Sequence, residues 1–185
     1  MSSPSSSPKY TILIVDDNPE LLESLRFAIS LLGDGDFQVE TAMDGAQGLE
    51  RVVELRPDCV IIDVKMPALN GYQLVHALRG DPETATIPLV LLSAMVQERD
   101  TLAGMLAGAD QYLTKPAHPR TIVEAIRAGI SLTQGQREQR LQDLVTLALA
   151  ESASSSEEGE AEPRRTEDQG PEEDGDEPVW RHRSE

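Results

Sequence analysis

Five side chains that could act together each follow a short apolar segment of the sequence: Asp16 and Asp17, Asp63, Ser93 and Lys115. If these segments are parallel strands of one sheet, their carboxyl ends meet at the same edge, where such sheets bind ligands. Taken singly, an Asp, a Ser or a Lys after a strand is usually a turn residue or a helix cap. Their repetition at four strand ends favours one shared site with three carboxylates, a hydroxyl and an ammonium group.

The chemistry of this set points to phosphate. Clustered carboxylates raise one another's pKa unless a cation keeps them ionised. Since the set offers oxygen ligands without His or Cys, the cation it favours is a hard one such as Mg²⁺. Lys115 could bind one oxygen of a phosphoryl group, and Ser93 could donate a hydrogen bond to another. A carboxylate can also attack phosphorus and form an acyl phosphate, and Asp63, on the expected middle strand, is the natural nucleophile.

The segments that must position these residues alternate between two patterns. Short runs rich in β-branched residues predict strands at residues 11–15, 37–41, 59–62, 88–92 and 111–113. Apolar residues at helical spacing follow each run, and they include Leu25, Val52, Val75, Met105 and Ile126. Five alternations of strand and helix predict an α/β domain with a parallel sheet and right-handed crossovers.

Charge and composition set the limits of the folded part. The chain of 185 residues has 33 acidic and 16 basic residues, a formal net charge of −17. Residues 151–185 hold 13 acidic and 4 basic residues with very few apolar ones, which predicts a disordered acidic tail. Residues 1–8 are rich in Ser and Pro, which predicts a flexible N-terminus. We therefore expect one domain within roughly the first 150 residues.

The same composition disfavours several classes of protein. A strongly acidic chain without a basic stripe is a poor direct binder of nucleic acid. No apolar run approaches the roughly 20 residues of a membrane span, and the first residues lack the apolar core of a secretory signal. The single cysteine, Cys59, is expected to be a small buried hydrophobe. These observations predict a cytoplasmic protein that does not contact a membrane.

A further helix is predicted at residues 133–150. Its apolar residues fall on one face: Leu141, Leu144, Val145, Ala148 and Leu149. Three interpretations of this amphipathic stripe remain open. The helix could pack back on the domain, contact a protein partner or a second copy in a homodimer, or lead to an output domain outside this sequence.

Four motifs stand in a fixed order along the chain: IVDDNP, which contains Asp16, IIDVKMPALNG, which contains Asp63, LLSA with Ser93, and YLTKP with Lys115. Together they resemble the receiver domain of response regulators in two-component signalling, and the resemblance covers about residues 9–132. It implies a flavodoxin-like fold with a five-stranded parallel sheet of strand order 2-1-3-4-5. Residues 133–150 would then be a helical extension of that domain.

The resemblance also implies a role for each residue of the site. Asp63 would be the phosphoacceptor, and Lys115 would bind the phosphoryl group. Asp16, Asp17 and Asp63 would hold Mg²⁺ together with the backbone carbonyl of Lys65. The phosphoryl group would come from a sensor histidine kinase or a histidine phosphotransfer protein.

Two further residues would carry the signal. The resemblance implies that Ser93 moves toward the phosphoryl group and that Tyr112 fills the space it leaves. The face made by the fourth helix, the fifth strand and the fifth helix would change shape and contact a downstream protein. It also implies a cis peptide bond between Lys115 and Pro116.

Two other functions are compared with this interpretation, a phosphatase and an interaction scaffold. A haloacid-dehalogenase-type phosphatase also uses a nucleophilic Asp with Mg²⁺, but it needs a second Asp where this sequence has Lys65. An interaction scaffold, acting through the amphipathic helix and the tail without phosphorylation, is the main alternative. After residue 150 we expect the tail and no output domain, so the expected catalysis is limited to self-phosphotransfer and autodephosphorylation. Lys65 and Met95, which overhang the attacking water in this family, offer it no good acceptor and predict a long-lived phosphoryl group.

Overall fold

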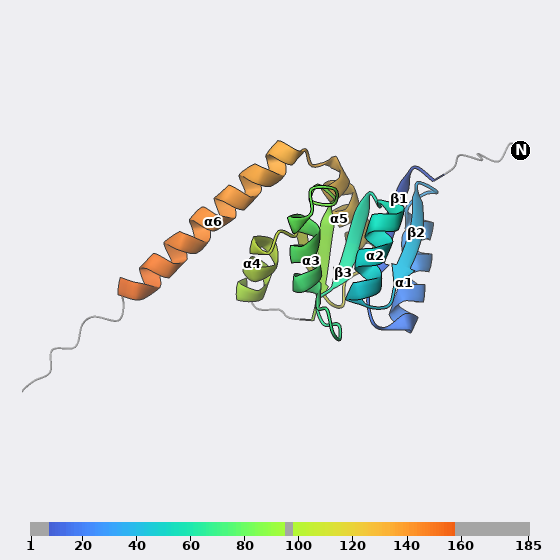
Figure 1. Cartoon of the computed structure of the whole chain (residues 1–185), viewed down its shortest axis with the longest axis horizontal. Coiled ribbons are helices and arrows are strands. Elements are labelled where there is room, and N and C mark those ends of the chain that lie inside the picture. Colours follow the sequence, from blue (N-terminus) through green and yellow to red (C-terminus); the bar gives the residue numbers. More distant parts are fainter. Residues whose placement is uncertain (1–7, 95–97, 158–185) are drawn as a thin grey trace, which may run out of the picture.

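A five-stranded parallel sheet forms the centre of the molecule. The structure, a computed structural model, describes residues 8–94 and 98–157. The strands lie in the order β2-β1-β3-β4-β5 (Figure 1). Their bounds are Tyr10–Val15 for β1, Phe37–Ala42 for β2, Cys59–Asp63 for β3, Leu89–Ser93 for β4 and Gln111–Thr114 for β5. Each strand begins and ends within one residue of its predicted range. The order of the strands in the parallel sheet confirms the predicted flavodoxin-like fold.

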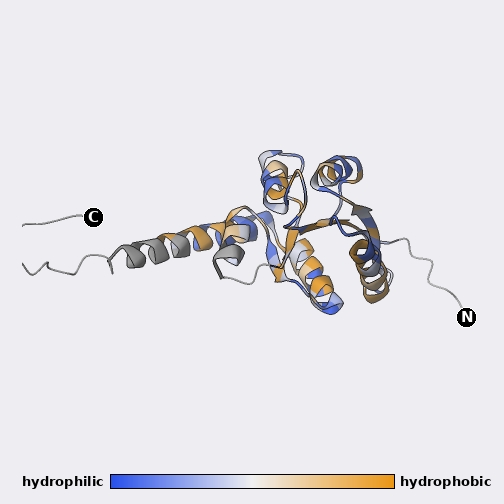
Figure 2. Cartoon of the chain, turned by 90° about the horizontal axis from the view of Figure 1, so that it is seen from below, coloured by the Kyte–Doolittle hydropathy of each residue, from blue (hydrophilic) through white to orange (hydrophobic). Residues whose placement is uncertain are grey.

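Helices cover both faces of this sheet. Their bounds in the described residues are Pro19–Leu32 for α1, Gly45–Leu55 for α2, Gly71–Gly80 for α3, Glu98–Leu106 for α4, Pro119–Ser131 for α5 and Gln134–Glu157 for α6. Helices α1 and α5 pack together on one face, and α2 and α3 pack together on the other. Figure 2 shows the apolar strands, in orange, between these two layers.

The core follows from strands that are apolar on both faces. Strands β3 and β4 bury every side chain, and β1 buries its last four. Alternate residues therefore enter opposite layers, so that Val15 meets α2 and α3 while Ile14 meets α1 and α5. Cys59 is fully buried in β3, as predicted, and burial raises the pKa of its thiol far above the ordinary range. The thiol is therefore an unreactive part of the core.

The C-terminal helix α6 is present but ends later than predicted. It begins at Gln134 and continues past residue 150 to Glu157, so residues 151–157 are helical rather than part of the expected tail. These residues contain no Gly or Pro, and each added helical residue gains a backbone hydrogen bond, so nothing in the sequence stops the helix at 150. The rest of the tail, the N-terminal residues 1–7 and Met95 lie outside the described residues. Within residues 8–94 and 98–157, no helix has the length and apolar character needed to cross a bilayer.

Candidate phosphorylation site

The ammonium group of Lys115 lies between two carboxylates at the carboxyl edge of the sheet. Its Nζ is 2.6 Å from Oδ2 of Asp16 and 2.5 Å from Oδ1 of Asp63. Asp16 directly follows β1 and is 2% exposed, and Asp63 ends the neighbouring strand β3 and is 5% exposed. Lys115 follows β5 and is joined to Pro116 by the expected cis peptide bond. The structure therefore brings together three of the predicted residues from three separate strands.

The electrostatics of this trio leave it with excess negative charge. Burial raises the pKa of Asp63, and the carboxylate of Asp16 raises it further, while the hydrogen bond and charge of Lys115 act in the opposite direction. The net result is a pKa above the ordinary value for Asp63. Burial alone would lower the pKa of Lys115, but the hydrogen bonds to both carboxylates together with their negative charges outweigh burial and raise it. Lys115 is thus firmly protonated and neutralises only one of the two buried carboxylates.

Ser93 ends β4, the strand between Asp63 and Lys115. It is buried, and its backbone carbonyl accepts a hydrogen bond of 2.7 Å from the backbone N–H of Lys115. The neighbouring pairing places Leu92 opposite Asp63 and Thr114 opposite Ser93. This register puts the three strand ends at one level, so the hydroxyl is delivered to the same edge as the ion pair.

Tyr112 lies further from the ion pair, on β5 beneath α4. Its ring is half-buried and packs against the core layer of α2 and α3. Gly104 of α4 lies directly over this ring, because a Cβ atom at Gly104 would be only 2.6 Å from Cδ2 of Tyr112. The absence of a side chain at Gly104 therefore lets α4 seat on the aromatic ring.

The loop between β3 and α3 holds the backbone of Asp63 in place. The backbone N–H of Lys65 donates a hydrogen bond to the Asp63 carboxylate, and the N–H of Gly71 donates to the carbonyl of Val64 at 3.1 Å. Asn70 and Gln73 cap the start of α3 through reciprocal side-chain hydrogen bonds of 3.0 Å. The loop therefore has little freedom to move the carboxylate.

A second glycine supports this loop from α2. A side chain at Gly45 would overlap the backbone of Leu69, so only a glycine allows the close approach. The sequence analysis did not single out Gly45. A glycine between a predicted strand and a helical pattern is too common on its own to indicate a site.

Asp17 stands apart from the buried trio. It is exposed, and it lines a cleft with Lys65 and the residues that follow: Val64, Met66, Pro67, Asn70 and Tyr72. Among the described residues, no three His, Cys, Asp or Glu side chains are grouped closely enough to hold a metal ion by themselves. Lys115 lies between Asp16 and Asp63, and Asp17 is exposed to solvent at the same strand end.

The donor set nevertheless fits a hard cation. Asp16, Asp17 and Asp63 are three carboxylates, and Lys115 neutralises only one of them, so a divalent ion would balance the remaining charge. The backbone carbonyl of Lys65 belongs to the loop that lines the cleft beside Asp17. Ligands and charge are therefore suitable for Mg²⁺ at this edge.

Comparisons with known proteins agree with the geometry. The profile of the response regulator receiver domain matches residues 12–127. The transcriptional regulatory protein PrrA of Mycobacterium leprae is 41% identical over 123 residues, which cover 66% of this chain and 50% of that protein. The DNA-binding response regulator MtrA of Mycolicibacterium smegmatis is 40% identical over 120 residues, which cover 65% of this chain and 50% of that protein. The chain therefore spans about half the length of these curated relatives.

Solved structures show the same fold. The receiver domain of a signal transduction histidine kinase from Syntrophus aciditrophicus is 33% identical with a TM-score of 0.59, over 66% of this chain and 90% of that one. The chemotaxis protein CheY4 of Vibrio cholerae is 27% identical with a TM-score of 0.59, over 67% of this chain and 99% of that one. The family profile, the relatives and the strand order agree, and the chain belongs to the response regulator receiver family of two-component signalling systems.

Proposed function

We propose that this chain accepts a phosphoryl group on Asp63 from a phosphohistidine, carried by a sensor histidine kinase or a histidine phosphotransfer protein. The observation that carries this proposal is the position of Lys115, whose ammonium group lies within 2.6 Å of both Asp16 and Asp63. A buried carboxylate beside a fixed cation can be ionised and nucleophilic at a site from which most water is excluded.

The transfer step uses the carboxylate of Asp63 directly. One Oδ atom attacks phosphorus, a P–O bond forms, and the P–N bond of the phosphohistidine breaks. The imidazole leaves with the bonding electron pair and takes up a proton. The product is an acyl phosphate, whose phosphoryl group carries roughly −1.5 to −2 charges in place of the single negative charge of the free carboxylate.

Lys115 and Ser93 are suited to receive this product. In the unmodified protein Lys115 is shared by two carboxylates, and after transfer its ammonium group can bind an oxygen of the phosphoryl group. The hydroxyl of Ser93 can donate a hydrogen bond to another oxygen. A movement of Ser93 toward the phosphoryl group would change the packing near Tyr112 and α4.

Asp16, Asp17, Asp63 and the carbonyl of Lys65 would hold Mg²⁺. When bound, this ion supplies positive charge that neutralises the phosphoryl oxygens and the surrounding carboxylates. The same site would later hydrolyse its own acyl phosphate, with water attacking phosphorus and the carboxylate of Asp63 as the leaving group.

We further propose that the chain signals in the cytoplasm through protein contacts. The two curated relatives described above carry names that refer to DNA binding or transcription, but this chain matches only about half of their length. The net charge of −17 disfavours direct contact with nucleic acid. The output would then be a protein that recognises the phosphorylated form.

Phosphorylation of Asp63 can be tested directly. The purified chain would be treated with acetyl phosphate and Mg²⁺ and examined by intact mass and peptide mass spectrometry. We expect one phosphoryl group on the peptide with Asp63, none in Asp63→Asn, and none in EDTA. The matched control is Asp34→Asn, an exposed turn residue with a φ of 54°, which Asn tolerates. Labelling of Asp63→Asn at the wild-type level would overturn the proposal.

The scaffold alternative makes a different prediction. Lysate proteins captured by the beryllofluoride-treated chain would be compared with those captured by Asp63→Asn. Partners that require beryllofluoride support signalling through phosphorylation. Equal capture by both forms would favour an interaction scaffold that acts through α6 or the tail.

A further inference from the structure

Helix α6 touches the domain along a narrow stripe. Burial is described for residues 134–146 and 149 of this helix, and among them only Arg137 and Leu144 are partly buried. These two residues lie seven positions apart, two turns along one face. The apolar residues Leu141, Val145 and Leu149 are 42%, 42% and 65% exposed. Among the α6 side chains whose burial is described, one cation and one leucine are therefore the most buried against the domain.

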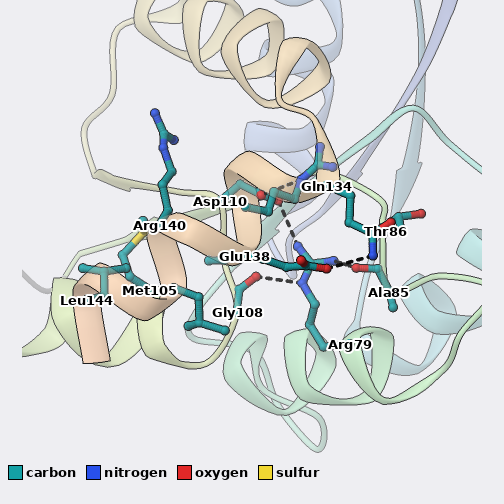
Figure 3. Close-up of a pocket in the computed structure, with 13 residues that line it drawn as sticks. Arg79, Ala85, Thr86, Met105, Gly108, Asp110, Gln134, Glu138, Arg140 and Leu144 are labelled. Carbon is teal, nitrogen blue, oxygen red and sulfur yellow. Dashed lines mark hydrogen bonds and ion pairs between the residues drawn. The ribbon is translucent and has the colours of Figure 1, made fainter. Parts of the chain in front are cut away.

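The cation is bound at a buried carboxylate. Nε of Arg137 donates to Oδ1 of Asp110 at 2.8 Å, and Nη2 donates to the carbonyl of Gly129 at 2.9 Å. Figure 3 shows Asp110 with the dashed lines to its partners. The side chains of Arg137 and Asp110 are 18% and 5% exposed. An ion pair with this little solvent contact is screened less by salt than the exposed pairs elsewhere in the described residues.

Asp110 is held by the domain whether or not α6 is present. Its other oxygen, Oδ2, accepts hydrogen bonds from Nη2 of Arg79 at 2.9 Å and from the backbone N–H of Leu89 at 2.8 Å. Arg79 is fixed in turn by the carbonyls of Gly108, Ala85 and Ile87. Because Asp110 keeps a cationic partner without Arg137, α6 can leave without stranding a buried charge.

The leucine packs against α4. Leu144 lines a hollow together with Met105 of α4, and Figure 3 shows the two side chains close to one another. Leu144 and Met105 also border a second hollow with Gln111, the first residue of β5. Helix α6 therefore covers the end of α4 and the beginning of β5.

Helix α4 connects this contact to the aromatic ring of Tyr112. Gly104 seats on that ring from one side of α4, and the next residue, Met105, borders α6. A shift of Tyr112 or α4 must therefore change the contact between Met105 and Leu144. The Arg137 contact is made elsewhere, to Gly129 of α5 and to Asp110, which is itself held by Arg79 of α3 and Leu89 of β4.

We propose that α6 reversibly covers the surface formed by α4 and β5. The ion pair between Arg137 and Asp110 holds the helix there, and the packing of Leu144 on α4 weakens when α4 shifts. The regulatory part of this inference rests on the phosphorylation proposed for Asp63. The cover competes with any protein that would dock on α4 and β5. By linkage, a change that releases α6 also favours the activated state of the site.

The connection between α5 and α6 allows such a movement. Leu132 is extended, with φ −71° and ψ 128°, and it separates the two helices. Thr133 and Gln136 exchange hydrogen bonds at the start of α6, of 2.9 Å and 3.3 Å. The N-terminal cap of α6 therefore does not depend on the domain, and the helix can rotate as a rigid unit about Leu132.

Hydrogen exchange of the full chain tests the cover itself. Arg137→Ala is compared with Arg140→Ala, which removes the same charge from an exposed position one turn away. We expect amides of α4 and of the beginning of β5 to exchange about tenfold faster, or more, in Arg137→Ala and to be unchanged in Arg140→Ala. Asp110→Asn is unsuitable because it would also disturb Arg79 and Leu89. Equal exchange in wild type and Arg137→Ala would overturn the proposal.

Beryllofluoride with Mg²⁺ tests the coupling. Protection of the loop at residues 64–70 reports that the ligand binds beside Asp63, which the proposed function requires. If that protection occurs, we expect α6 to exchange faster in wild type and beryllofluoride to bind about fivefold more tightly to Arg137→Ala than to Arg140→Ala. Protection of the loop with no change in α6 and equal affinities would overturn the coupling. No protection of the loop would instead count against the phosphorylation of Asp63 and, with it, against the regulatory part of this inference.

Discussion

Gly71 lies directly against the backbone of Asp63, so close that a methyl group on Gly71 would overlap the Asp63 carbonyl and the Cα of Val64. The overlap involves backbone atoms, which cannot rotate away as a flexible side chain would. Any side chain at residue 71 must therefore push the loop and the carboxylate out of place.

Gly71→Ala is expected to lower the free energy of unfolding by about 2 kcal/mol and to slow labelling by acetyl phosphate. The matched control is Gly80→Ala at the end of the same helix, where a new Cβ would meet nothing within 4 Å. We expect Gly80→Ala to be neutral or slightly stabilising. Urea denaturation and the labelling rate check both variants, and equal behaviour of the two would show that the contact at Gly71 is unimportant.

The raised pKa of Asp63 predicts a pH-dependent effect of its replacement. Between the ordinary carboxyl pKa of 3.8 and the raised pKa, the folded protein binds more protons than the unfolded one. Stability therefore falls as pH rises through this window, and above it the wild type carries the full cost of a buried charge. In EDTA near neutral pH, Asp63→Asn should therefore be more stable than the wild type.

Urea denaturation at several pH values measures this difference. The advantage of Asp63→Asn should shrink as pH falls from about 7 toward about 4, because the wild-type carboxyl then becomes protonated. Asp34→Asn, which changes an exposed carboxyl, should show no such trend. An advantage that grows on acidification would contradict the direction assigned to the Asp63 pKa.

Asp17 should matter for metal binding and not for stability. Because Asp17 is exposed, Asp17→Asn is expected to leave the urea midpoint unchanged. As a proposed ligand, its loss should weaken Mg²⁺ binding about tenfold by isothermal titration calorimetry. Asp34→Asn again serves as the control. Unchanged Mg²⁺ affinity in Asp17→Asn would remove this residue from the ligand set.

The lifetime of the phosphoryl group should depend on residues 65 and 95. Lys65 is exposed in the loop after Asp63, and it carries donors but no acceptor for a water's protons. Met95 lies outside the described residues, and its thioether is a poor acceptor. We expect slow dephosphorylation in the wild type and about tenfold faster decay in Lys65→Asn with Met95→Glu. Decay of the labelled protein decides this, and equally rapid loss from both forms would show that these positions do not set the rate.

The strands were predictable because buried strands consist of continuous runs of apolar residues. Continuous apolar runs rich in β-branched residues, as at β1, β3 and β4, are typical of strands covered on both faces, and the polar residue after each run then marks the carboxyl edge. Asp16, Asp63, Ser93 and Lys115 were therefore placed correctly at this edge. The exposure of Asp17 was not foreseen, since two adjacent acidic residues give no sign of which one turns inward.

Other features depend on contacts that no local pattern contains. Asp110 is paired with Arg79 and Arg137, which lie 31 and 27 residues away, and each is an ordinary surface charge when viewed alone. The packing of α6 on the domain was one of three interpretations left open by its amphipathic stripe. The stripe was an incomplete guide to this contact, because Leu141, Val145 and Leu149 stay partly or largely exposed whereas the polar Arg137 forms a nearly buried ion pair.

The two outer strands of the sheet have a consequence for aggregation. Edge strands expose unpaired backbone groups to which another chain could add as a further strand. At one edge, β2 carries Gln38 and Glu40, which share a hydrogen bond of 3.1 Å, and Arg51 binds Glu40 at 2.8 Å. At the other edge, β5 spans only Gln111–Thr114. The charged residues on β2 and the short length of β5 both disfavour the addition of a further strand. The sheet is therefore protected at both edges against amyloid-type growth.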